Sequence, residues 1–88
     1  MRQGKISHIC KNNMVAVYTH PFDGEQYTTF EILNDVSCIS IGDLIEWDSD
    51  FGMGHEQYRN KTTNKLIAVY VENHCVVPSI LSKQLKNK

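Results

Sequence analysis

The chain has 88 residues and a mass of 10.1 kDa, the size of one small domain rather than two. Hydrophobic residues make up 41% and charged residues 22%, a balance typical of a globular domain and not of a disordered chain. No apolar run reaches the roughly 18 residues of a membrane-spanning helix, and no apolar stretch follows the basic start, as it would in a secretory signal. We therefore expect a single cytoplasmic domain.

The formal net charge is −1, but the charges are distributed unevenly along the chain. Residues 1–58 carry three basic and nine acidic side chains, whereas residues 59–88 carry six basic side chains and one acidic one. The basic C-terminal third is where an anionic partner is expected to bind. The three cysteines Cys10, Cys38 and Cys75 are an odd number without Cys-x-x-Cys spacing, which predicts reduced thiols rather than a disulfide framework.

Short segments in which apolar and polar residues alternate predict β-strands in the first part of the chain. Residues 5–10 form the first expected strand, and the asparagines that follow at 12–13 tolerate the backbone angles of a tight turn. The second expected strand covers residues 14–20. A turn at residues 21–24, Pro-Phe-Asp-Gly, separates it from the third expected strand at residues 26–33.

Two further strands are expected after a less regular stretch. In residues 44–48, Ile45 and Trp47 share one face, which predicts that the single tryptophan is a core anchor. The last strong strand is residues 66–72, and residues 56–60 are a short arm that could pair with it. The glycine-containing segment from 50 to 55 is expected to be a loop.

The C-terminal segment predicts a short helix, because Pro78 suits the first helical turn and Leu81 and Leu85 fall on one stripe. We divide the chain into a barrel domain over residues 1–77 and a short helical or flexible basic tail over residues 78–88. The predicted fold class is all-β: a small five-stranded antiparallel barrel with this short C-terminal helix or tail.

Three motifs match the turns and strands of a known family of barrels. Gly4-Lys5-Ile6 is similar to that family's opening strand, Asp23-Gly24 falls at its second turn, and residues 42–47, Gly-Asp-Leu-Ile-Glu-Trp, are similar to its Gly-x-x-Val-x-Phe strand. The family is the cold-shock domain, an OB-fold, and the likeness covers roughly residues 4–71. The resemblance implies an OB-like barrel that binds single-stranded nucleic acid. The strand count and the turn placement also fit an SH3-like barrel.

The chain departs from the cold-shock pattern at the positions that bind bases in that family. Residues 14–17 are Met-Val-Ala-Val, without the aromatic side chains that the family displays on its second strand. Residues 28–31 keep Phe30, which the alternation places in the core. His8-Ile9 stands where the opening strand of the family carries a Trp-Phe pair.

Nucleic-acid binding would therefore use other side chains. Aromatic faces stack on bases, and basic side chains neutralise phosphates. The candidate residues are Tyr18, Tyr27 and Tyr58 for stacking, with Arg2, Lys5, Arg59, Lys61 and Lys65 for phosphates. The alternative is that Tyr18 and Tyr27 form a cross-strand pair that only stabilises the sheet.

Two groups of residues contain metal-ligand types. The acidic group is Asp43, Glu46, Asp48, Asp50 and Glu56. It lacks the spacing of a calcium loop, and a solvated acidic strand edge explains it better. The second group comprises His8, Cys10, His74 and Cys75, whose spacing matches no zinc signature. We expect neither a metal nor another cofactor.

No catalytic motif is present in the sequence, so we expect a binding module rather than an enzyme. The leading hypothesis is weak, salt-sensitive binding of single-stranded RNA or DNA. The alternative is a protein-interaction or homo-oligomerising module, in which the acidic part of one copy would dock on the basic part of another.

Overall fold

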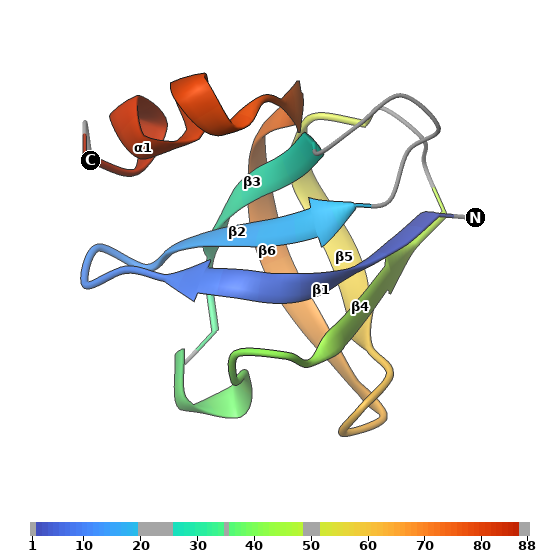
Figure 1. Cartoon of the computed structure of the whole chain (residues 1–88). Helices are drawn as coiled ribbons and strands as arrows, with labels where there is room; N and C mark the ends of the chain where they lie inside the picture. Colours follow the sequence, from blue (N-terminus) through green and yellow to red (C-terminus); the bar gives the residue numbers. More distant parts are fainter. Residues whose placement is uncertain (1, 20–25, 35, 49–51, 87–88) are drawn as a thin grey trace.

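The computed structural model describes residues 2–19, 26–34, 36–48 and 52–86 (Figure 1). Six strands and one α-helix make up most of this part of the chain. Their bounds are β1 Arg2–Ile9, β2 Met14–Thr19, β3 Gln26–Ile32, β4 Leu44–Trp47, β5 Gly54–Asn60, β6 Lys65–Val76 and α1 Pro78–Lys86, with a 3-10 turn, η1, at Val36–Cys38. The strands close into one barrel in the order β1-β2-β3-β6-β5-β4. The predicted all-β barrel and C-terminal helix are confirmed.

The barrel has six strands, not the five expected, and all neighbouring pairs are antiparallel. Strand directions can alternate all the way round a ring only when the number of strands is even. A five-stranded barrel would therefore need one parallel pair. The sixth strand is β5, which the sequence suggests only as a short arm at residues 56–60. It begins at Gly54, so residues 54 and 55 belong to a strand and not to the expected loop.

The barrel interior is filled by the side chains that the alternation predicts. Ile45 and Trp47 on β4 are buried, as is Phe30 on β3. Three aromatic rings meet at the centre: Tyr58 stacks on Trp47 with ring centroids 4.7 Å apart, and it meets Phe30 edge-on at 5.4 Å. Offset and edge-to-face ring contacts of this kind stabilise a core beyond the area that they bury.

Gly4 allows β1 to run close to β2. A Cβ atom at this position would collide with the backbone carbonyl oxygen of Tyr18 and would lie 2.6 Å from Cγ1 of Val17. A side chain at residue 4 is therefore sterically excluded. In register, Gly4 lies opposite Thr19 on β2 and Ile45 on β4, so it sits where β1 joins both of its neighbours.

Helix α1 packs on the outside of the barrel (Figure 1). Leu81 is 5% exposed and forms a small cluster with Ala16 and Val76, against which Tyr27 also packs. Within the described ranges, no helix has the length and apolar character needed to cross a membrane. Because Leu81 is buried against the barrel, this leucine attaches the C-terminal tail to it.

Candidate nucleic-acid interface

A row of side chains crosses the outer face of β1, β2 and β3. Tyr18 lies directly opposite Tyr27, and Lys5 lies directly opposite Tyr18 on the other side. Directly paired residues project from the same face of a sheet, and the neighbouring Val17 and Ile6 point into the core. The three side chains therefore share the outer face.

The two tyrosine rings of this row are in contact. Their centroids are 5.5 Å apart and their planes are inclined by 68°. Both residues are half-buried, so each ring keeps part of its surface accessible. The cross-strand pair that the sequence analysis offers as an alternative is present, and it stabilises the sheet whether or not a ligand binds.

His8 extends this aromatic group, although no pattern in the sequence places it there. Its ring centroid lies 6.1 Å from that of Tyr27, and Nδ1 is hydrogen-bonded to Ser7 Oγ at 2.8 Å. The register of β1 against β2 shifts between Ile6 and His8. This bulge changes the direction in which His8 projects, and the sequence carries no signal for it.

The basic candidates lie at different distances from the tyrosines around the barrel. Lys5 is the neighbour of Tyr18. Lys61 lies further along the same row, because its backbone N–H donates to the carbonyl oxygen of Leu44, which pairs with Lys5. Arg59 and Lys65 lie on β5 and β6, away from β2. All four are exposed, but the structure brings only Lys5 next to the aromatic rings.

Tyr58 cannot stack on a base, and the prediction that includes it is wrong. Its side chain is 0% exposed, between Trp47 and Phe30. Burial raises the pKa of its hydroxyl well above the usual value, and the nearby charge of Glu56 adds to this effect while that of Arg2 opposes it.

Arg2 also differs from the expectation. It pairs in register with Trp47, whose side chain points inward, and its Nε atom is buried. Its charge acts on the Tyr58 hydroxyl inside the barrel. Arg2 is therefore a poor candidate for a phosphate contact.

The histidines and cysteines with metal-ligand chemistry have separate environments. His74 donates a hydrogen bond from Nε2 to the carbonyl oxygen of Gly52 at 2.8 Å, and its Nδ1 lies 3.0 Å from Thr28 Oγ1. Cys10 and Cys38 are half-buried free thiols. The side chain of Cys75, and all of Asp50, lie outside the described residues. Among those that are described, no three His, Cys, Asp or Glu residues are grouped as metal ligands would be.

Acidic and basic residues that are separated along the sequence lie on neighbouring strands of the barrel. β4, with Glu46 on the strand and Asp48 directly after its end, lies between β1, with Lys5, and β5, with Arg59. Glu46 faces Arg59 directly. Acidic and basic side chains therefore alternate around this part of the barrel.

No protein-family model, curated protein or solved structure matches this chain. What the protein binds is therefore inferred from its own residues.

Proposed function

We propose that this protein is a non-enzymatic cytoplasmic module that binds single-stranded RNA or DNA, weakly and in a salt-sensitive manner, on the outer face of β1–β3. The row of Lys5, Tyr18 and Tyr27, with His8 beside it, carries this proposal. Stacking on an aromatic ring contributes about 1–3 kcal/mol per base and tolerates any sequence. A neighbouring lysine supplies the charge for a phosphate.

The position of the row supports the same proposal. Cold-shock domains, which the opening and fourth-strand motifs of this chain resemble, display their base-stacking residues on the second and third strands. Tyr18 and Tyr27 lie on β2 and β3. Leu81 of α1 contacts the same cluster as Tyr27, so the helix bounds the proposed face on one side. A short face of this kind fits weak binding of a few nucleotides.

The first test is an amide NMR titration of the isotope-labelled protein with a mixed-sequence single-stranded oligonucleotide, at low and at moderate salt. We expect shifts clustered on β1, β2 and β3. Tyr18→Ala should weaken binding by about 1–3 kcal/mol. Lys5→Ala should lower the slope of log K against log salt by about 0.7, the value for one phosphate contact on a single strand.

Tyr70→Ala is the matched control. Tyr70 lies on β6, where its ring meets that of His55 edge-on at 5.0 Å, so it has an aromatic neighbour of its own. Binding should survive this change. Absence of shifts at both salt concentrations, or a loss of binding that is equal for Tyr70→Ala and Tyr18→Ala, would reject the proposal.

A second candidate function is protein interaction through the outer face of β3, β6 and β5. Three large apolar side chains are exposed there: Leu33 at 47%, Leu66 at 54% and Tyr70 at 40%. The Leu33 N–H donates to the carbonyl oxygen of Ala68, which places Leu33 beside β6. Self-association through this face predicts a mass that rises with concentration in sedimentation, and Leu66→Glu should abolish that rise.

A further inference from the structure

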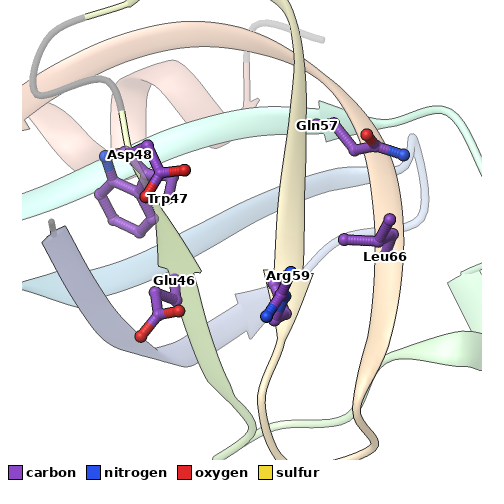
Figure 2. Close-up of a pocket in the computed structure, with 6 residues that line it drawn as sticks. All are labelled: Glu46, Trp47, Asp48, Gln57, Arg59 and Leu66. Atoms are coloured by element: carbon purple, nitrogen blue, oxygen red, sulfur yellow. The ribbon is translucent and has the colours of Figure 1, made fainter.

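A pocket lies where β4 and β5 diverge. The pairing described between these strands consists of Ile45 with Asn60 and Glu46 with Arg59. The second of these pairs and the residues next to it, Trp47 and Asp48 on one side and Gln57 on the other, line a pocket of about 380 Å³. Figure 2 shows its lining residues, which are Glu46, Trp47 and Asp48 beside Gln57, Arg59 and Leu66. The volume lies at the lower end of the range for small-ligand sites.

The strands around the pocket contribute different functional groups to its lining. Two carboxylates belong to the lining: that of Glu46 on β4, and that of Asp48, which directly follows the end of β4 at Trp47. β5 contributes the guanidinium of Arg59 and the amide of Gln57, and β6 contributes the apolar side chain of Leu66 (Figure 2). The ionised groups sum to a formal charge of −1, and both signs are presented to a ligand.

The charged groups of the pocket are available for a ligand. Glu46 and Arg59 are directly opposed in register, a position at which opposite charges can pair. Within the part of the chain that the structure describes, the side chains of Glu46, Asp48 and Arg59 form no hydrogen bond or ion pair. All three side chains can therefore engage a bound molecule without first breaking an internal contact.

These features narrow the class of ligand. Two adjacent carboxylates repel a phosphate, which excludes the nucleic-acid backbone from this pocket. A guanidinium in the lining and only two carboxylates are unsuitable for a calcium or magnesium ion. A single leucine is too little apolar surface for a hydrophobic ligand. The remaining match is a small molecule that carries a cation, an aliphatic stem and a carboxylate.

We propose that the pocket binds a basic α-amino acid group, that of arginine or lysine. Glu46 and Asp48 hold the cationic head, Leu66 contacts the aliphatic stem, and Arg59 pairs with the carboxylate while Gln57 donates a hydrogen bond to it. Charge-assisted hydrogen bonds of this type are the strongest in proteins. The net charge of the amino acid, +1, complements that of the pocket. The lining comes from β5, β6 and the end of β4, whereas the proposed nucleic-acid interface is on β1–β3, so this assignment does not depend on that function.

The probe is L-arginine, titrated into the isotope-labelled protein at constant ionic strength. We expect saturable amide shifts at residues 46–48, 57–59 and 66. L-norleucine lacks the side-chain cation and arginine amide lacks the carboxylate, so each should bind at least about tenfold more weakly. An arginine concentration of about 10 mM is high enough to detect binding with a dissociation constant of about 1 mM. Absence of saturable shifts at that concentration would overturn the proposal.

Three substitutions test which side chain of the pocket binds which group of arginine. Glu46→Gln and Asp48→Asn should each weaken arginine binding by about tenfold. Arg59→Gln should remove the preference for arginine over arginine amide, a result that a merely structural role would not produce. The control is Glu31→Gln, an acidic position on β3 outside the pocket, which should leave binding unchanged. Amide spectra of the unliganded variants show whether each is folded, and equal weakening by all four would overturn the proposal.

The basic group could belong to a free amino acid or to the last residue of a peptide. Nα-acetyl-L-arginine keeps the side chain and the carboxylate but lacks the α-ammonium group. Binding as tight as that of L-arginine assigns the pocket to a peptide C-terminus. Binding that is weaker by about tenfold or more assigns it to the free amino acid.

Discussion

Asn60 donates a hydrogen bond from Nδ2 to Oδ2 of Asp43 at 2.8 Å, and both side chains are buried. Each has a second partner. The same carboxylate oxygen accepts from the backbone N–H of Ser40 at 3.0 Å, and Asn60 Oδ1 accepts from the backbone N–H of Thr62 at 3.0 Å. This pair therefore ties the turn that leads into β4 to the turn between β5 and β6. A buried carboxylate needs such partners, because burying it unpaired is costly.

Asn60→Ala should lower the free energy of unfolding by about 2–3 kcal/mol, because it leaves the Asp43 carboxylate buried with fewer donors. Urea unfolding measures the change. Asn73→Ala, at an exposed position of β6, is the control and should change stability by less than about 0.5 kcal/mol. Equal effects of the two changes would show that the buried pair contributes nothing special.

Tyr58→Phe should leave stability unchanged or raise it by about 1 kcal/mol. The hydroxyl of Tyr58 is buried and has no hydrogen-bond partner among the described residues, whereas its ring packs on Trp47 and Phe30. Removing an unpaired polar group while keeping the ring avoids a desolvation cost. Tyr58→Ala, by contrast, should cost about 3–5 kcal/mol. A clear loss of stability in Tyr58→Phe would reveal a partner for the hydroxyl.

Alkaline pH should destabilise the protein through Tyr58. Burial raises the pKa of this group in the folded state above its unfolded value of about 10. Above pH 10 the unfolded chain has lost this proton and the folded chain has kept it, so the free energy of unfolding falls as pH rises, by up to about 1.4 kcal/mol per pH unit. Thermal melts between pH 8 and 12 measure the slope, which Tyr58→Phe should reduce by up to the same amount.

Removal of residues 78–88 should leave the barrel folded but less stable by about 1–2 kcal/mol. Leu81 of α1 is buried against Ala16 and Val76, and burying one leucine contributes an amount of this order. Leu81→Ala should reproduce most of the loss in a thermal melt. If the truncated chain loses its cooperative transition altogether, α1 is part of the folding unit.

The alternation of apolar residues was sufficient to predict most of the core. Ile67, Val69 and Val71 are buried because a period of two places every second side chain on the same face. The same alternation does not predict the full length of β5, because its inward positions include Glu56, Tyr58 and Asn60 and its outward positions are polar too. A strand without an apolar face carries no such signal, so the sequence does not reveal that Tyr58 is buried.

Local periodicity and turn residues were thus enough to predict the all-β class, the inward faces of β2, β3, β4 and β6, and a short helical or flexible C-terminal segment. Which side chains are neighbours across strands becomes known only when the strands are paired in the folded barrel. The row of Lys5, Tyr18 and Tyr27 and the opposition of Glu46 and Arg59 both depend on strand register and on closure of the ring. Register joins residues that are distant in the chain, so no local pattern encodes it.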